Sequence, residues 1–377
     1  MNPSQWRLAC RERWSELRNR LLGSPRFHAW ASRFPLTRPI ARRQAGALFD
    51  LCAGFVYSQI LLACVQLRLF ERLAAGPQDL VTLAAESGLS RERMTRLLDA
   101  AVALQLIDRR GKDRFGLGPH GAVLAGNEGI QAMVRHHAVL YADLADPLAL
   151  FKDQVTQPGL ARYWAYADNS QSASDLQGEQ VSEYSDLMAA SQSLIAEQVL
   201  ASYSLRQHRC VLDVGGGQGA FLSAVASRWP HLDLMLFDLP AVADRGKQQL
   251  TASHPGRKVE TFGGDFFADP LPPGADLITL VRVIHDHNDP EALKLLQAVR
   301  RQLPANGVLL LAEPMAGDKA TDRVADAYFG LYLLAMGKGR ARSPTEIGGL
   351  LAEAGFSRHR LLVSHMPLQT RVMVAYA

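Results

Sequence analysis

Residues 210–240 read CVLDVGGGQGAFLSAVASRWPHLDLMLFDLP and contain the most specific pattern in the chain. An apolar strand runs into Asp213, and a second apolar strand, 234–237, ends in Asp238. Between them come three glycines at alternate positions, Gly215, Gly217 and Gly219. This order predicts a strand–helix–strand unit whose glycine turn lets a ligand approach the backbone and whose second acid reaches a ribose. We expect an adenosine-containing cofactor.

The glycine turn alone fits more than one cofactor. Gly215, Gly217 and Ala220 satisfy the G-x-G-x-x-G/A pattern of dinucleotide sites, so NAD stays open, as does a purely structural turn. Asp213 argues against a pyrophosphate, because its charge would repel phosphates gathered at a helix N-terminus. S-adenosylmethionine carries adenine, a ribose diol, an amino group and a sulfonium cation but no phosphate. It is the cofactor that we favour.

The ends of successive strands supply the expected cofactor contacts, since ligands of open α/β sheets lie beyond the carboxyl ends of the strands. Asp238 can accept both ribose hydroxyls. In GGDFF, Asp265 can accept from the adenine amino group, or else cap a turn, and Phe266 can cover the ring. The full set of expected cofactor contacts is Asp213, Gly215, Gly217, Asp238, Leu239, Asp265, Phe266 and Arg282.

A candidate general base follows the fourth strand, 277–284. His285 has an ordinary pKa near neutrality, so it can take a proton from a hydroxyl whose oxygen attacks a methyl group. The fifth strand ends at Glu313, placed to fix the tautomer of that ring and to stabilise its cation. We expect His285, Glu313 and Asp286 to be the catalytic residues. A structural histidine is the alternative.

A metal site is a further interpretation of the same stretch, through His285, Asp286, His287 and Asp289. Their spacing matches no established zinc pattern, and no cysteine lies near. They imitate only loosely the carboxylate-rich magnesium sites of catecholic methyltransferases. We expect no metal.

The fold class expected for residues 206–377 is α/β. The last two candidate strands, 361–364 and 372–375, are joined by a turn too short for a crossover helix, so they should be antiparallel. A Rossmann-like sheet with an antiparallel last strand is typical of methyltransferases.

The preceding part of the chain is predicted to be helical. Helices at 59–73, 79–87 and 91–104 and a small hairpin form a winged-helix pattern over residues 46–120, and residues 121–205 form a helical region that lines a pocket. A winged helix can bind DNA, but Glu92 and Asp99 interrupt the basic third helix and an enzyme-like domain follows. We therefore expect dimerisation and no nucleic acid.

Two histidines in the helical region, His136 and His137, are either structural or in contact with substrate.

Residues 1–45 form a basic arm with ten arginines against Glu12 and Glu16, a net +8. Tryptophans, leucines and a cysteine recur there at helical spacing: Trp6, Cys10, Trp14, Leu17 and Leu21. A basic amphipathic helix with tryptophans suits an anionic membrane surface, so peripheral contact with the inner membrane is one expectation. Packing on the body or on a partner subunit is the other.

The composition of the whole chain is that of an ordinary globular protein, with 48% hydrophobic and 21% charged residues. Four scattered cysteines lack metal or disulfide spacing, which favours the cytoplasm. We expect no signal peptide. The most apolar stretch, residues 48–65, contains Asp50, Ser58 and Gln59, so we expect a buried helix rather than a membrane span.

The motifs together resemble the small-molecule O-methyltransferase family of plants and bacteria that includes caffeate and acetylserotonin methyltransferases. The resemblance runs from about Phe49 to the C-terminus and rests on LDVGGGQG, FDLP, GDFF, IHDH, AEP and LLAEAGF in this order. It implies a homodimer, His285 as the base, Glu313 as its flanking acid, and Asp238 and Asp265 as cofactor ligands.

The chain departs from the family pattern at two places. His287 stands where the family often has an aromatic residue after His-Asp. A second flanking glutamate, usual in a G-[KR]-E-R-T stretch, falls at Ala341 in GRARS (residues 339–343). The orientation of His285 thus depends on other contacts.

Within the family, four stretches look like the carotenoid-modifying enzymes of purple photosynthetic bacteria: residues 33–42, residues 47–59, VRVIHDH and GRARS. This implies methylation of the tertiary C1 hydroxyl of a long acyclic carotenoid. A phenol or polyketide acceptor is the alternative substrate. A non-catalytic winged-helix regulator and a tetrapyrrole methyltransferase are alternatives from other classes.

Overall fold

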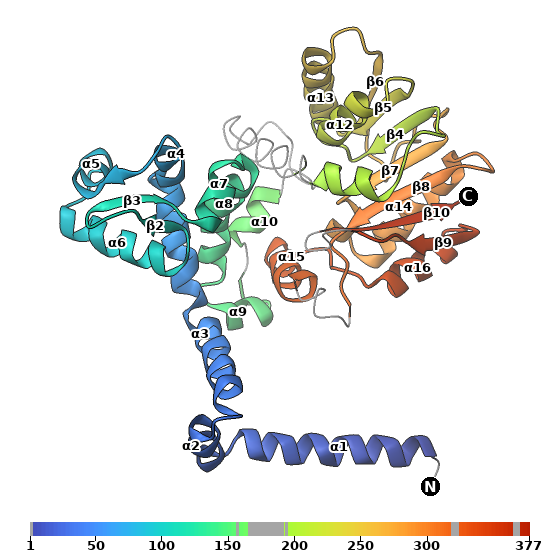
Figure 1. Cartoon of the computed structure of the whole chain (residues 1–377). Helices are drawn as coiled ribbons and strands as arrows, with labels where there is room; N and C mark the ends of the chain where they lie inside the picture. Colours follow the sequence, from blue (N-terminus) through green and yellow to red (C-terminus); the bar gives the residue numbers. More distant parts are fainter. Residues whose placement is uncertain (1–2, 156–157, 165–191, 193–194, 318–323, 365–369) are drawn as a thin grey trace. The chain divides into compact units, whose positions relative to one another are not determined.

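The computed structural model of the protein describes residues 3–155, 158–164, 192, 195–317, 324–364 and 370–377 (Figure 1). The chain divides into two compact units, Met1–Ala122 and Val123–Ala377. The four-part division drawn from the sequence stays a prediction. Part of its helical region, residues 165–191, lies outside the described residues.

The first unit is built from helices and a short antiparallel sheet. Its helices are α1 (Pro3–Leu22), α2 (Pro25–Arg33), α3 (Arg38–Gln66), α4 (Leu69–Ala74), α5 (Leu80–Glu86) and α6 (Arg91–Ala103). Its strands are β1 (Gln78–Asp79), β2 (Ile107–Arg109) and β3 (Arg114–Leu117), paired in the order β1-β3-β2. From α4 to β3 the elements follow in the order of a winged-helix unit. Asp79 and Ser90 cap α5 and α6 through their side chains.

The predicted helix 59–73 is two helices. Arg68 adopts a left-handed conformation with φ of 55°, which ends α3 and starts α4. A non-glycine residue is costly there, and no glycine or proline marked the break in the sequence.

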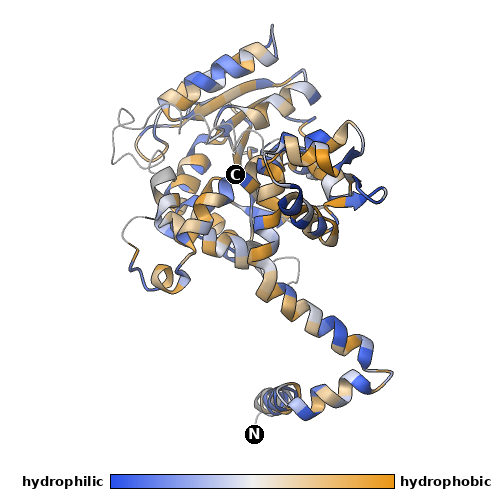
Figure 2. Ribbon diagram, turned by 90° about the vertical axis from the view of Figure 1, so that its left-hand side faces the viewer, coloured by the Kyte–Doolittle hydropathy of each residue, from blue (hydrophilic) through white to orange (hydrophobic). Residues whose placement is uncertain are grey.

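The expectation of a buried helix over residues 48–65 is wrong for the single chain. Only Leu62, Cys64 and Val65 of α3 are buried. Large apolar side chains on the preceding turns are exposed: Ile40, Leu48, Phe49, Leu51, Phe55 and Val56. Figure 2 colours the ribbon by hydropathy, and hydrophobic turns alternate with hydrophilic ones along the long helix α3. By length and composition α3 is the one helix among the described residues that could cross a membrane. Its apolar face requires a cover that this unit does not supply.

The second unit contains a seven-stranded sheet with helices on both faces. Its helices are α8 (Glu128–Asp143), α9 (Pro147–Phe151), α10 (Gly159–Trp164), α12 (Ala220–Arg228), α13 (Pro240–Ser253), α14 (Asp289–Gln302), the π-helical η4 (Val324–Phe329), α15 (Gly330–Met336) and α16 (Pro344–Glu353). A short 3-10 turn, η2 (Ile284–Asp286), carries the candidate base, and α7 (Pro119–Ala125) spans the division between the units.

The strands are β4 (Cys210–Val214), β5 (Asp233–Asp238), β6 (Val259–Gly263), β7 (Leu277–Val281), β8 (Val308–Glu313), β9 (Arg358–Leu361) and β10 (Arg371–Tyr376), in the order β6-β5-β4-β7-β8-β10-β9. Strands β6, β5, β4, β7 and β8 are parallel, and β10 is antiparallel to both β8 and β9. The predicted Rossmann-like sheet with an antiparallel last strand is confirmed. The predicted strand 361–364 begins three residues earlier, and the predicted strand 277–284 ends earlier, at Val281.

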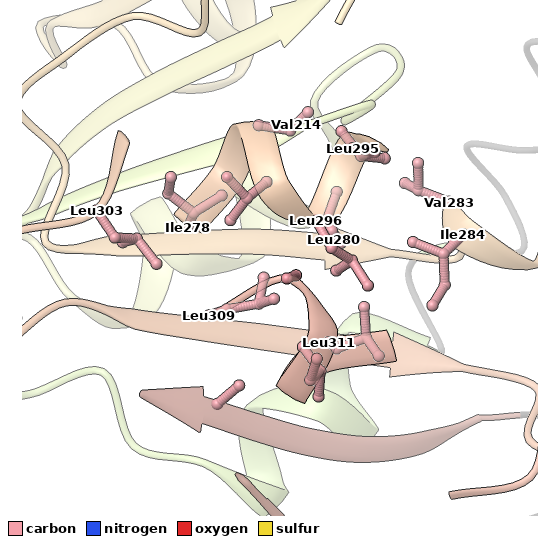
Figure 3. Packing of buried hydrophobic residues seen from close by; sticks show 14 of the residues in the cluster. Val214, Ile278, Leu280, Val283, Ile284, Leu295, Leu296, Leu303, Leu309 and Leu311 are labelled. Carbon is pink, nitrogen blue, oxygen red and sulfur yellow. The ribbon is translucent and has the colours of Figure 1, made fainter. Parts of the chain in front are cut away.

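Alternate side chains of each central strand enter two separate cores, as the pleat of a sheet requires. Figure 3 shows the core in which Ile278, Leu280, Leu309 and Leu311 pack with Leu296 and its neighbours from α14. On the opposite face, residues such as Leu277 and Leu310 pack against α12 and the segment 195–205. Because both faces are buried, these strands are almost continuously apolar, and a charged residue at a strand end stands out.

The strand order reverses between β4 and β7. From β4 the chain moves outward through β5 to β6 and then returns to the other side of β4. In such sheets the ligand crevice lies beyond the carboxyl ends of the two strands at the reversal. Those ends carry the glycine loop and the turn with His285.

Candidate active site

The glycine loop after β4 is folded by positive φ angles at Gly215, Gly217 and Gly219, of 67°, 59° and 80°. Its start is anchored because Gly215 N donates to Phe237 O at 2.8 Å. A Cβ on Gly215 would come within 2.9 Å of Val283, which follows β7, so the two strand ends at the reversal are in contact. By contrast, a Cβ on Gly217 would meet nothing within 4 Å. Gly217 is therefore the glycine of this loop that faces open space.

Asp213 lies beneath the glycine loop and is 1% exposed. Its Oδ1 accepts a 2.6 Å hydrogen bond from Thr279 Oγ1, and its Oδ2 has no hydrogen-bond partner among the described residues. Burial raises the pKa of Asp213 to about 7, although the Thr279 hydroxyl works in the other direction. A buried carboxylate oxygen without a partner is suited to a cationic or hydrogen-bonding ligand.

Asp238 ends β5 beside the loop. Its Oδ2 accepts from Gly217 N and its Oδ1 from Leu239 N, both at 2.7 Å. Burial raises the pKa of Asp238 to about 6, while these two backbone N–H groups lower it. Each carboxylate oxygen still has a free acceptor direction, which is what two ribose hydroxyls need.

Asp265 and Phe266 follow β6. Asp265 Oδ1 accepts from Phe267 N at 2.8 Å, so the turn-cap alternative is realised on one carboxylate oxygen. Phe266 packs edge-on against Phe267 and His287, with ring centroids 4.7 Å and 5.6 Å apart. His287 thus supplies a ring where the family often has an aromatic residue. Burial lowers its pKa to about 4, so this imidazole is neutral.

The turn that carries His285 begins as β7 ends. Arg282 takes φ of 60°, a strained value for a non-glycine residue, and its N–H donates to Ala312 O at 2.7 Å. Its side-chain Nε is buried without a hydrogen-bond partner among the described residues. The chain then turns through η2, which places His285 at the sheet edge with 5% exposure.

Glu313, at the end of β8, holds this turn through both of its carboxylate oxygens. Oε2 is 2.6 Å from His285 Nδ1, and Oε1 accepts from Val283 N and Ile284 N at 2.9 Å and 2.8 Å. Because Glu313 is the carboxylate with hydrogen-bond geometry to this ring, we assign the proton of the neutral imidazole to Nδ1 and the acceptor role to Nε2. The predicted proximity of Glu313 to the candidate base is what the structure shows.

Asp286 occupies the other side of the ring. Its Oδ1 is 3.1 Å from His285 Nε2, within ion-pair range, but the angles are not those of a hydrogen bond. Burial alone would lower the pKa of His285, yet the carboxylates of Asp286 and Glu313 outweigh it and the pKa is raised. A second carboxylate thus flanks the candidate base, and it comes from the next residue in the chain.

His136 and His137 on α8 pair with tyrosines of η4 and α15. His136 Nε2 is 2.9 Å from the Tyr332 hydroxyl, and His137 Nε2 is 2.6 Å from the Tyr328 hydroxyl. Between these tyrosines, Phe329 meets the His285 ring edge-on with centroids 6.1 Å apart. The two pairs therefore hold an aromatic wall against the candidate base.

No local pattern pointed to the tyrosines, because Tyr328 of η4 and Tyr332 of α15 lie 191 and 196 residues along the chain from their histidines. The histidine pair itself was the available signal.

Among the described residues, no group of three or more His, Cys, Asp and Glu side chains is placed to hold a metal ion.

Fold and site together define a class. A sheet of this order, with an antiparallel strand inserted before its edge, an open glycine turn and acids after β4 and β5, is the fold of a methyltransferase that uses S-adenosylmethionine. The residues fit that cofactor: Gly217 leaves space for it, Asp213 has an unpaired buried oxygen, and two carboxylates disfavour phosphate.

The comparisons with known proteins agree. Residues 141–357 match the family described as "O-methyltransferase domain" and residues 49–127 the "O-methyltransferase dimerisation domain". The chain belongs to the S-adenosylmethionine-dependent O-methyltransferases that carry this dimerisation domain, and it is such an enzyme.

Among its relatives, the demethylspheroidene O-methyltransferase of Cereibacter sphaeroides is 45% identical over 96% of this chain and 94% of its own length. The enzyme of the same name from Rhodobacter capsulatus is 44% identical over 90% of this chain and 84% of its own. The crystal structure of human N-acetylserotonin methyltransferase in complex with SAM has a TM-score of 0.70 and 25% identity, covering 88% of this chain and 97% of that one.

Two glycines of the loop should respond differently to alanine. In Gly217→Ala the new methyl group enters open space, so the fold loses only about 1–2 kcal/mol for the left-handed backbone. The methyl group then occupies the cofactor's space, and we expect the Kd for S-adenosylmethionine to rise more than about tenfold.

Gly219→Ala is the matched control, because its φ of 80° is also positive but its Cβ would lie 2.5 Å from Leu250 Cδ1 in the core. Overpacking should lower its stability by about a further 1–3 kcal/mol while the space at Gly217 stays open. Calorimetric titration and thermal unfolding separate the two effects. Unchanged cofactor affinity in Gly217→Ala would remove this loop from the cofactor site.

Proposed function

We propose that this enzyme methylates the tertiary C1 hydroxyl of a long acyclic carotenoid such as demethylspheroidene or hydroxyneurosporene. The main observation that supports methyl transfer to a hydroxyl is the buried His285–Glu313 pair beside the open glycine loop. The substrate class is supported by the two demethylspheroidene O-methyltransferases, at 45% and 44% identity. Phe329, Tyr328 and Tyr332 supply an aromatic surface next to His285, which suits a polyene.

We assign the cofactor's adenosine to Asp238, Leu239, Asp265 and Phe266 and its amino-acid part to Asp213, the glycine loop and Arg282. When bound, S-adenosylmethionine supplies a methyl group made electrophilic by a positively charged sulfur. The carboxylates of Asp213 and Asp238 stabilise that positive charge. Because a nearby cation favours the ionised carboxylate, the raised pKa values of both acids should fall when the cofactor is bound.

His285 takes the proton of the acceptor. Its Nδ1–H is held by Glu313, so Nε2 is the atom that can receive the hydroxyl proton as the oxygen forms its bond to carbon. The imidazolium that results lies between the carboxylates of Glu313 and Asp286, which stabilise it. A tertiary alcohol is weakly acidic, so its proton should leave late, during methyl transfer, and a base fixed in place matters more than it does for a phenol.

A phenol or polyketide is the second candidate acceptor, favoured by the same base and by the acetylserotonin relatives. The test is a panel in which 1-hydroxy carotenoids in detergent or vesicles and a set of phenols are incubated with enzyme and labelled cofactor. The proposal expects kcat/KM to be highest for the carotenoid alcohol. Faster methylation of a phenol would overturn it in favour of the alternative.

The exposed apolar face of α3 supports a homodimer. The match to the dimerisation domain begins at residue 49, within the run of exposed residues Leu48, Phe49, Leu51 and Phe55. A second copy that covers this face would remove it from water, so we propose that the active species has twice the chain's 41.3 kDa. Light scattering of the purified enzyme measures this directly.

Residues 1–45 are proposed to hold the enzyme on the cytoplasmic side of the inner, photosynthetic membrane. The arm precedes both family matches, the first of which begins at residue 49. Helix α2 separates its apolar and polar faces more strongly than α1 does. In α1, arginines lie on both sides of the row that contains Trp6 and Trp14, so this helix has no clean apolar face. In α2, Trp30 stacks on Phe34 with centroids 5.2 Å apart, and Trp30 is 52% exposed.

Deleting residues 1–45 is expected to abolish co-sedimentation with anionic vesicles, since each arginine near such a surface contributes about 1 kcal/mol. The full chain should bind anionic vesicles more than zwitterionic ones and release them in high salt. Turnover of a carotenoid dissolved in detergent should persist in the truncated enzyme. Equal vesicle binding by both proteins would show that the arm is not the membrane contact.

A further inference from the structure

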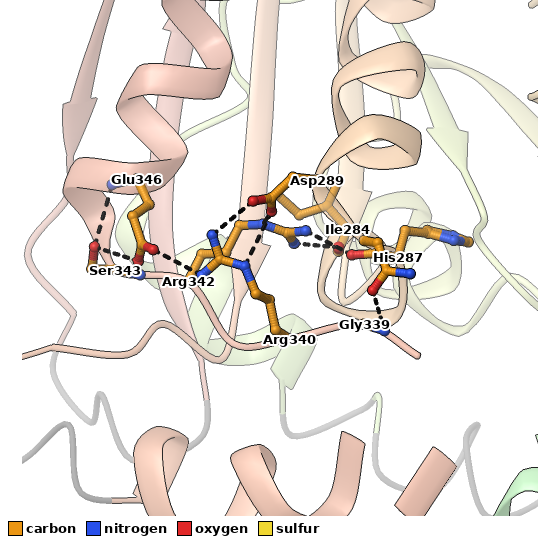
Figure 4. Close-up of polar contacts among 9 residues, drawn as sticks. Ile284, His287, Asp289, Gly339, Arg340, Arg342, Ser343 and Glu346 are labelled. Atoms are coloured by element: carbon orange, nitrogen blue, oxygen red, sulfur yellow. Dashed lines mark hydrogen bonds and ion pairs between the residues drawn. The ribbon is translucent and has the colours of Figure 1, made fainter. Parts of the chain in front are cut away.

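The segment 339–343, GRARS, lies directly against the turn that carries His285 (Figure 4). Gly339 has φ of 81°, and a Cβ there would come within 2.2 Å of His285 O and 2.7 Å of the Asp286 carbonyl carbon. Arg340 N donates to His285 O at 2.9 Å. A side chain at Gly339 would force this segment away from the turn, so the contact depends on glycine.

Arg342 is the centre of the contact and is only 2% exposed. Its Nη1 donates to Ile284 O at 2.7 Å, its Nη2 to His287 O at 2.6 Å and its Nε to Asp289 Oδ1 at 2.7 Å. A planar guanidinium can satisfy three acceptors in a fixed fan, which an ammonium group cannot. Figure 4 shows these bonds reaching both ends of the η2 turn.

The contacts of Arg342 complement those of Glu313. Glu313 accepts hydrogen bonds from the N–H groups of Val283 and Ile284, and it pairs with the His285 ring. Arg342 instead donates hydrogen bonds to carbonyl oxygens on the far side of the same turn. Arg342 O in turn accepts from Ala316 N at 3.0 Å, three residues after Glu313. The turn is thus fixed at its donors by one residue and at its acceptors by the other.

We propose that Arg342 is a positioning residue for methyl transfer, which aims His285 Nε2 at the acceptor by holding the carbonyls of Ile284 and His287. The inference rests on the proposed role of His285 as the base. Glu313 and Asp286 flank the imidazole itself, whereas Arg342 holds the backbone carbonyls of the turn from which that ring projects.

Arg340 offers a matched comparison. Its side chain is 43% exposed and binds Asp289 and Glu346, so it shares the arginine chemistry and one partner with Arg342 but makes no side-chain bond to a turn carbonyl. Arg340→Met should therefore leave kcat near that of the wild type, while Arg342→Met should not.

The experiment measures kcat, acceptor KM, cofactor Kd and the pH dependence of kcat/KM for these variants. Arg342→Met is expected to lower kcat by about 10²-fold, the effect of a misplaced catalytic group. Cofactor Kd should stay within about twofold, because no cofactor contact is removed. The acid limb should move to lower pH, since a loosened turn lets His285 leave the carboxylates that raise its pKa. Arg342→Lys should lie between the wild type and Arg342→Met.

A cycle with His285→Gln separates this inference from the proposed function. If Arg342 acts through the base, Arg342→Met costs nothing further in the His285→Gln background. Unchanged kcat and pH profile in Arg342→Met, or an equal loss in both backgrounds, would overturn the inference and leave the base assignment standing. Full activity of His285→Gln alone would instead overturn the base. Should Arg342→Met fail to fold, Gly339→Ala and Arg342→Lys must show the same direction in kcat and pH profile for the inference to hold.

Discussion

Replacing His285 with glutamine is expected to lower kcat by roughly 10²–10⁴-fold, the usual contribution of a general base. Glutamine keeps a polar side chain in the buried space but has no acceptor that can take a full proton. A tertiary alcohol has little tendency to ionise by itself, so the loss should lie toward the upper end with a carotenoid alcohol and toward the lower end with a phenol.

Cofactor affinity separates loss of the base from loss of the site. The cofactor contacts after β4, β5 and β6 do not include the imidazole, so Kd for S-adenosylmethionine should change by less than about threefold. His231→Gln, at an exposed position between α12 and β5, is the control for a histidine substitution as such. Wild-type turnover in His285→Gln would exclude this residue as the base.

Glu313→Gln is expected to reduce kcat by roughly 10³–10⁴-fold, as when the carboxylate behind a catalytic imidazole is replaced by an amide. The buried side chain keeps its shape and can still accept from Val283 N and Ile284 N. Its amide NH2 would however face His285 Nδ1, which must then become the acceptor. The proton moves to Nε2, and the base is blocked in the wrong tautomer.

The pH dependence of kcat/KM is an independent check, because the direction in which its acid limb moves can be predicted. His285 must be neutral to act, and its pKa is raised in the native protein, so kcat/KM of the wild type should fall on an acid limb above pH 6.5. Removing a carboxylate lowers that pKa, so the residual activity of Glu313→Gln and that of Asp286→Asn should show the limb at lower pH. The raised pKa also means that protonated His285 adds stability below pH 6.5, which is lost as pH rises through the native pKa.

An acid limb that stays in place in both variants would show that another group titrates. Steady-state rates between pH 5 and 9, with labelled cofactor at saturation, are sufficient for this check.

The strand ends could be predicted from the sequence because each is an apolar run that stops at a charged or polar residue. Asp213, Asp238 and Glu313 each stand at such an end, and the sheet brings those ends to one edge. Asp265 was harder to assign, since a carboxylate before two aromatic residues suits a turn cap as well as an adenine contact, and one of its oxygens does cap the turn.

Other features depend on contacts that no local pattern contains. In the sequence Arg342 is one of two arginines in GRARS with nothing to distinguish it from Arg340, and only the structure shows that it is buried against the turn. The break at Arg68 has no glycine to mark it. The face of α3 was expected to be buried because it is apolar, whereas a single chain leaves it exposed for a partner. Periodicity shows which face is apolar, but not which molecule covers it.

The central claim is that Glu313 holds His285 with its proton on Nδ1 and its Nε2 free to accept. Nitrogen-15 NMR of histidine-labelled enzyme, with His285 assigned by its absence in His285→Gln, measures that tautomer directly. Above the raised pKa, we predict a protonated Nδ1 and a bare Nε2, and the reverse arrangement in Glu313→Gln. A wild-type ring that carries its proton on Nε2 would contradict the account.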